Sequence, residues 1–123
     1  MQIPILKQGL FLIVSIQNID GDGDLTALEN ELSEKVGTYR SKGVIIDVTT
    51  MDVMDSFSTR TLRNIVHTIK LRGAETVIVG IQPEVAFAMI QLGLKLDDVK
   101  TALNLEDGLL ILNAHFKEKN NGY

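Results

Sequence analysis

The residues best suited to chemistry are the hydroxyl and carboxylate side chains of residues 55–60, Asp-Ser-Phe-Ser-Thr-Arg. They follow a short β-branched run at residues 44–48 and open a segment with helical spacing. A helix start carries partial positive charge and unpaired N–H groups, so it holds anions well. The pattern therefore makes Ser56 a candidate phosphate acceptor for another protein's kinase, with Ser58 as the alternative acceptor.

A phosphate on Ser56 would add about −1.5 to −2 charges at pH 7 beside this positive helix end. Arg60, one turn further along, is placed to reach the phosphate, whereas Asp52 and Asp55 would oppose it. Together with Phe57, these residues form the expected switch surface, which becomes strongly anionic and repels a partner. The plainer alternative is that Ser56 or Asp55 only caps the helix and takes part in no chemistry.

Asp47 ends the buried run, where a response-regulator receiver carries its phosphoacceptor. A receiver also needs an acidic pair after its first strand and a lysine after its last strand. Here residues 17–18 are Gln-Asn, and Lys100 lies within or beside the last expected strand. The sequence thus favours a structural role in which Asp47 orders the loop before Ser56 by accepting backbone hydrogen bonds.

An acidic run at residues 20–24, Asp-Gly-Asp-Gly-Asp, invites comparison with a calcium loop, with Glu31 at the twelfth position. The sixth position is Leu25, however, where such a loop needs glycine, and a strand rather than a helix precedes it. We therefore expect a flexible turn that ends in an Asp24 helix cap, and no metal site.

The histidines give no sign of catalysis. The chain has two, His67 and His115, and spacing pairs neither with a serine or carboxylate. His67 is expected on the solvent side of its helix. No dinucleotide-binding, phosphate-loop or nucleophile-elbow motif occurs. The sequence predicts a protein that is not an enzyme and has no cofactor.

The composition of the chain further restricts which class of protein it can be. The 123 residues carry a net charge of −4, 45% are apolar, and none is cysteine, which fits one globular domain over residues 1–123 in a reducing cytoplasm. No Lys/Arg cluster is evident along the sequence, which argues against nucleic-acid binding. No leader pattern opens the chain, and no apolar stretch approaches the roughly 20 residues of a membrane span.

The elements that must position residues 55–60 can be read from apolar spacing and from glycine and proline. Strands are expected at residues 3–7, 10–16, 44–48, 76–81 and 99–101, and helices at 25–42, 56–72, 83–93 and 104–116. The order is β-β-α-β-α-β-α-β-α. Because strands joined through helices run parallel, we expect an α/β fold: a single mixed, mostly parallel sheet with packed helices.

At residues 54–57, Met-Asp-Ser-Phe, the chain resembles the STAS domain of bacterial anti-sigma factor antagonists. The resemblance covers nearly the whole length. Further segments that carry it are residues 3–7, 12–17, 44–47, 80–86 and 92–93. It implies the STAS fold without catalysis, and phosphorylation of the serine in the Asp-Ser pair, here Ser56.

The resemblance also implies partners. Free antagonists usually carry two glycines just after the Asp-Ser pair, and residues 57–60, Phe-Ser-Thr-Arg, have neither. This departure favours the stressosome scaffold branch of the family, which assembles with itself and with RsbR-like paralogues. Such a scaffold sequesters an RsbT-like serine kinase until stress, and an RsbX-like phosphatase resets the serine. The alternative is a free antagonist that binds an anti-sigma kinase directly.

Overall fold

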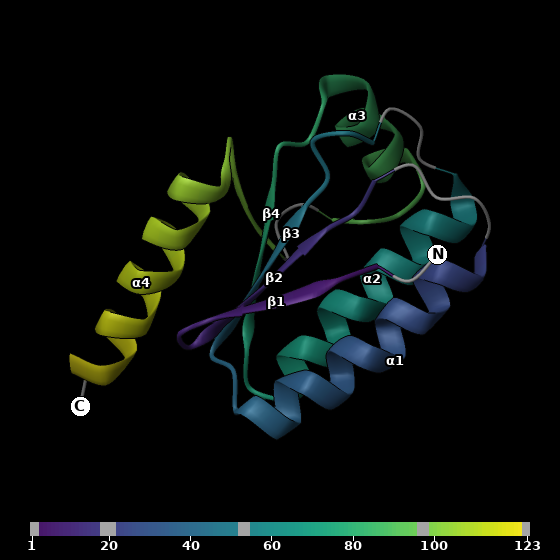
Figure 1. Ribbon diagram of the computed structural model, residues 1–123. Coiled ribbons are helices and arrows are strands. Elements are labelled where there is room, and N and C mark those ends of the chain that lie inside the picture. Colours follow the sequence, from purple (N-terminus) through teal and green to yellow (C-terminus); the bar gives the residue numbers. More distant parts are fainter. Residues whose placement is uncertain (1–2, 18–21, 52–54, 96–98, 122–123) are drawn as a thin grey trace.

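The computed structural model describes residues 3–17, 22–51, 55–95 and 99–121. Strands and helices follow one another in the predicted order (Figure 1). In chain order they are β1 (Ile5–Gln8), β2 (Phe11–Ser15), α1 (Asp22–Tyr39), β3 (Gly43–Asp47), α2 (Ser56–Leu71), β4 (Glu75–Val79), α3 (Pro83–Gln91), β5 (Lys100–Ala102) and α4 (Leu105–Asn121).

The five strands form one sheet in the order β1-β2-β3-β4-β5. β1 pairs antiparallel with β2, and the other three pairings are parallel. The fold is therefore the predicted mixed, mostly parallel α/β sheet. We call the side where the parallel strands end the carboxyl edge, and the side where they begin the amino edge.

The central strand β3 explains why the run at residues 44–48 is apolar throughout. Val44, Ile45 and Ile46 are fully buried, because helices cover the sheet on both faces. Ile46 belongs to the larger core, under α1, α2 and α3, while Ile45 belongs to a smaller core under α4. Figure 1 shows α1 and α2 side by side on one face and α4 on the other.

α4 packs closely on the sheet because its first turn contains Gly108. A Cβ atom at this position would lie 2.9 Å from Cγ1 of Val79 and 3.5 Å from Cδ1 of Ile45. One turn further along, Leu112 is buried in the smaller core with Phe11, Ile45 and Val77. Gly108 thus allows α4 to approach the sheet closely, and Leu112 fills the core beneath it, so that α4 packs over β3 and β4.

Several predicted details need correction. Asp24 is not a helix cap, because α1 already begins at Asp22. Apolar spacing also predicts Tyr39 and Leu105 on the apolar faces of their helices, but both are exposed, since each is a terminal residue of its helix. The expected strand at 99–101 is shifted by one residue, to Lys100–Ala102. The last helix opens with an asparagine, Asn104, which the sequence predicts as its cap. This prediction is confirmed: Oδ1 of Asn104 accepts a 2.9 Å hydrogen bond from the Asp107 N–H.

Candidate functional site

The connection from β3 to α2 delivers the candidate acceptor to the carboxyl edge. Asp55 is the N-cap of α2, with an extended backbone at φ −96° and ψ 178°. Its carboxylate accepts a 2.7 Å hydrogen bond from the Ser58 N–H, and its carbonyl accepts a 3.0 Å bond from the Thr59 N–H. These two bonds start the helix, so Asp55 rather than Ser56 fills the capping role.

The Asp55 cap also fixes the charge of the site. Hydrogen bonds from the backbone and then the side chain of Ser58 lower the pKa of the Asp55 carboxyl below its ordinary value, because they stabilise the ionised form. Asp55 is exposed to solvent. At neutral pH the anionic carboxylate of Asp55 therefore lies next to the candidate acceptor, Ser56.

Ser56 is the first residue of α2, and its side chain is exposed. No described residue forms a hydrogen bond with its hydroxyl. The amide groups of Ser56 and Phe57 precede the first intrahelical N–H donor, Thr59, so they are among the unpaired N–H groups of a helix start. The start of α2 therefore combines the exposed Ser56 hydroxyl, unpaired backbone N–H groups and the positive end of the helix dipole.

The neighbouring side chains are less accessible than Ser56. Phe57 packs partly buried against the larger core, and Ser58 is half-buried. Thr59 is only 1% exposed, and its Oγ1 has no partner among the described residues. Arg60 is exposed in the following turn. Among the three hydroxyl residues at positions 56, 58 and 59, Ser56 is thus the most open to a kinase.

Asp47 plays the structural role expected of it. Its carboxylate accepts a 2.9 Å hydrogen bond from the Thr49 N–H and a second bond from the Thr49 hydroxyl. The Thr49 carbonyl accepts a 2.9 Å bond from Nε2 of Gln82, which precedes α3. These bonds tie the start of the β3–α2 connection to the turn after β4.

Gly80 makes that tie possible. Its φ is +74°, and a Cβ atom there would clash with Oγ1 of Thr49. Both the left-handed backbone and the close approach of Thr49 require glycine. Residues that follow β3 and β4 therefore fix the start of the loop that leads to Ser56.

Some sequence predictions fall partly or wholly outside the structure. Asp52, assigned to the switch surface, lies outside the described residues, as does Asp20 of the acidic run. Asp22 and Asp24 lie in the first turn of α1. Within the described ranges there is no group of three or more potential metal ligands. Within the same ranges, no helix is both long enough and apolar enough to cross a membrane.

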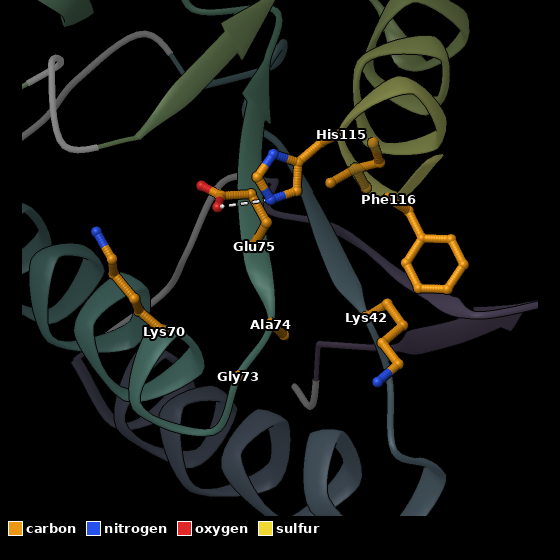
Figure 2. A pocket seen from close by; sticks show the side chains of 8 residues that line it. Lys42, Lys70, Gly73, Ala74, Glu75, His115 and Phe116 are labelled. Atoms are coloured by element: carbon orange, nitrogen blue, oxygen red, sulfur yellow. Dashed lines mark ion pairs between the residues drawn. The ribbon is translucent and has the colours of Figure 1, made fainter. Parts of the chain in front are cut away.

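The fold pairs one histidine in a way that spacing did not reveal. His67 is exposed, as predicted. Nε2 of His115 on α4 lies 3.5 Å from Oε2 of Glu75 at the start of β4, as Figure 2 shows. The pair lines a cavity of about 390 Å³ at the amino edge, the opposite edge from Ser56. No signal in the sequence links residues so far apart in the chain.

The fold and the Asp-Ser helix start define the class of the protein. The family model for the STAS domain matches residues 8–108. The chain therefore belongs to the STAS domain family, and the resemblance identified from its sequence is confirmed.

Within this family the chain is similar to RsbS and RsbR proteins. A serine-to-glutamate variant of RsbS from Moorella thermoacetica superimposes with a TM-score of 0.89 and 33% identity, over 95% of this chain and 99% of that chain. A chain from a structure of the stressosome, described as a signal integration and transduction hub, superimposes with a TM-score of 0.81 and 35% identity, over 90% of this chain and 96% of that chain.

Among curated proteins, the chain is 29% identical over 114 residues to RsbRD, an RsbT co-antagonist protein of Bacillus subtilis. The match covers 93% of this chain but 40% of that protein, so the chain spans about two-fifths of the length of this relative. Together with the two structures, this places the chain among the RsbS- and RsbR-like STAS proteins of the anti-sigma antagonist family.

Proposed function

We propose that this protein is a stressosome scaffold that sequesters an RsbT-like serine kinase and releases it when Ser56 is phosphorylated. Release of the kinase would then regulate the general stress pathway, which acts through a sigma factor. The observation that carries the proposal is the exposed Ser56 hydroxyl at the start of α2, beside a cap already filled by Asp55.

Phosphorylation at this position is compatible with the fold. The new group adds about −1.5 to −2 charges, and a helix N-terminus stabilises a nearby anion. The amides of Ser56 and Phe57 are available to receive it, because helical bonding starts at Thr59. The Asp55–Ser58 bond can persist, since it does not involve the Ser56 hydroxyl.

The same modification changes what the carboxyl edge can bind. Asp55 is ionised at neutral pH, as an ordinary aspartate is, and its lowered pKa keeps it ionised in more acidic solution. A phosphate on Ser56 therefore puts further negative charge beside an existing one. A partner surface complementary to the unmodified face would then meet like charges, which weakens association. We assign Asp55, Phe57 and Arg60 to this switch surface, and Asp52 on sequence grounds.

Ser58 is the second candidate acceptor. Its backbone N–H holds the Asp55 cap and its side chain is half-buried, so a kinase would have to disturb the helix start to reach it. Ser56 needs no such disturbance. The proposal therefore places phosphorylation on Ser56.

The similarity to RsbS, RsbR and a stressosome chain supports the proposed partners. We assign to this chain an RsbT-like kinase, RsbR-like paralogues in a large cytoplasmic assembly, and an RsbX-like phosphatase that resets Ser56. The alternative is a free antagonist that binds an anti-sigma kinase directly. Light scattering with an RsbR-like paralogue separates the two functions: megadalton particles support the scaffold, and small complexes support the antagonist.

Kinase binding tests the switch itself. Titration calorimetry with an RsbT-like kinase should give wild-type affinity for Ser56→Ala and at least about tenfold weaker binding for Ser56→Asp, because like charges brought together across an interface cost several kcal/mol. Arg63→Ala, on an exposed position of the same helix, is the control for a change outside the switch surface. Unchanged affinity in Ser56→Asp would contradict the switch.

A further inference from the structure

Gln82 is the residue before α3, and α3 does not explain why a glutamine stands there. The residue fills the N-cap position with an extended backbone, at φ −70° and ψ 147°, but its side chain forms no capping hydrogen bond. The residues favoured at this position are Ser, Thr, Asp and Asn. Pro83 follows at the start of the helix, where its fixed backbone angle suits the first helical position. The side chain of Gln82 therefore serves something other than α3.

The side-chain amide of Gln82 contacts the β3–α2 connection instead. Its Nε2 donates a 2.9 Å hydrogen bond to the carbonyl of Thr49, 33 residues away in the chain. Gln82 is half-buried, whereas Thr49 and Thr50 are exposed. The bond thus joins the start of α3 to an exposed part of the connection that leads to Ser56.

The other hydrogen bonds of residues 48–51 come mostly from the connection itself and the strands beside it. The Val48 N–H donates to the Val79 carbonyl, and the Met51 N–H donates to the Val48 carbonyl, both at 3.0 Å. The hydroxyl of Thr50 donates a 3.4 Å bond to the Ile16 carbonyl. Among the described residues, no side chain from outside the connection other than Gln82 donates a hydrogen bond to residues 48–51.

The acceptor at the other end of the connection is held independently of Gln82. Asp55 caps α2 through the Ser58 N–H, and Leu62 and Ile65 anchor the helix in the larger core. Loss of the Gln82 bond should therefore leave Ser56 in place and loosen residues 49–51. A kinase that modifies Ser56 has to contact the surface around it, and the exposed threonines at residues 49–50 lie at the same edge of the sheet.

We propose that Gln82 is a positioning residue for phosphorylation: its bond to Thr49 holds residues 49–51 in the arrangement that the kinase recognises. The inference rests on the proposed function, in which Ser56 is the acceptor, and adds a residue from a separate element to it. When only a fraction of the molecules has the competent arrangement, the apparent affinity falls by that fraction. Gln82 thus acts on recognition of the chain by the kinase and not on transfer of the phosphoryl group.

Steady-state phosphorylation of Ser56 by an RsbT-like kinase tests this role, with the chain as the varied substrate. Gln82→Met keeps the length of the side chain and removes the N–H donor. We expect KM to rise about two- to tenfold, the range that the net loss of one hydrogen bond spans, with kcat unchanged because α2 is untouched. Gln82→Glu should raise KM at least as much, since an ionised carboxylate cannot donate to the Thr49 carbonyl.

Gln91→Met is the matched control, because it makes the same substitution at an exposed position of the same helix. It should keep the wild-type KM. Unfolding cannot imitate the expected result: about a twofold rise in KM would require half of the variant to be unfolded, which circular dichroism detects. Amide hydrogen exchange of the chain alone gives a second measurement, in which the Met51 N–H should exchange faster in Gln82→Met than in Gln91→Met.

The outcomes separate this inference from the proposed function. A wild-type chain that is not labelled on Ser56 contradicts the proposed function, and this inference with it. Normal labelling of the wild type with an unchanged KM in folded Gln82→Met overturns the role of Gln82 alone. A loss confined to kcat, an equal rise in KM in Gln91→Met, or a Met51 N–H that exchanges no faster overturns that role as well.

Discussion

Asp55 determines where α2 begins, and its substitution should be visible in stability. Removing the cap in Asp55→Ala leaves the Ser58 N–H without its 2.7 Å partner. We expect a loss of about 1 kcal/mol in the free energy of unfolding at neutral pH, measured by urea denaturation. Asp55→Asn should lose much less, because asparagine caps helices about as well as aspartate.

The same comparison has a predicted pH dependence. The folded-state pKa of Asp55 is lowered, so the unfolded chain binds this proton more tightly. The stabilisation is fully present above the unfolded pKa and is lost as pH falls through the folded pKa. Urea denaturation across acidic pH should thus show the gap between wild type and Asp55→Ala closing. A gap that stays constant to the lowest pH would contradict the assignment.

Gly80 is the residue that lets two loops approach each other. Gly80→Ala must place a methyl group against Thr49 at a φ of +74°. Gly9→Ala is a matched control, because Gly9 has a φ of +60° and nothing within 4 Å of the added atom. We expect Gly80→Ala to lower the free energy of unfolding by about 1–3 kcal/mol more than Gly9→Ala, since overpacking adds to backbone strain. Equal losses would show that the Thr49 contact contributes nothing.

Among the helices, α4 provides a comparison within one element. Leu112 is 1% exposed in the smaller core and Leu110 is 66% exposed. Leu112→Ala should lower the free energy of unfolding by about 2–5 kcal/mol, and Leu110→Ala by no more than about 0.5 kcal/mol. Thermal and urea denaturation measure both. Similar losses for the two variants would mean that α4 does not pack on the sheet as described.

The elements were largely predictable, because their signals are local. Three-and-four spacing of apolar residues marked the helices, and the β-branched run at residues 44–48 marked the buried strand. Helix starts were less predictable where several cap residues follow one another: Asp24 was wrong for α1. At α4, a single asparagine, Asn104, was correct.

What could not be predicted is which distant side chains meet. His115 and Glu75 form a pair only because α4 returns over the start of β4, and Lys42, before β3, lines one cavity with Lys70 of α2. The candidate acceptor was accessible to sequence reasoning because Asp55, Ser56 and the helix they open are contiguous. A sequence motif can reveal a site of this kind, because its residues are neighbours in the chain.

At the scale of the whole molecule, parallel topology gives the two edges different properties. The carboxyl edge gathers helix starts, including the exposed Ser56, and the amino edge gathers helix ends.

The most direct test of the central claim is phosphosite mapping by mass spectrometry after incubation with an RsbT-like kinase. Wild type, Ser56→Ala and Ser58→Ala are compared, with kinase binding measured in parallel so that a loss of labelling is not a loss of docking. We predict that Ser56→Ala abolishes phosphate incorporation while retaining kinase binding, and that Ser58→Ala is labelled like the wild type. Equal labelling of Ser56→Ala and wild type would contradict the account.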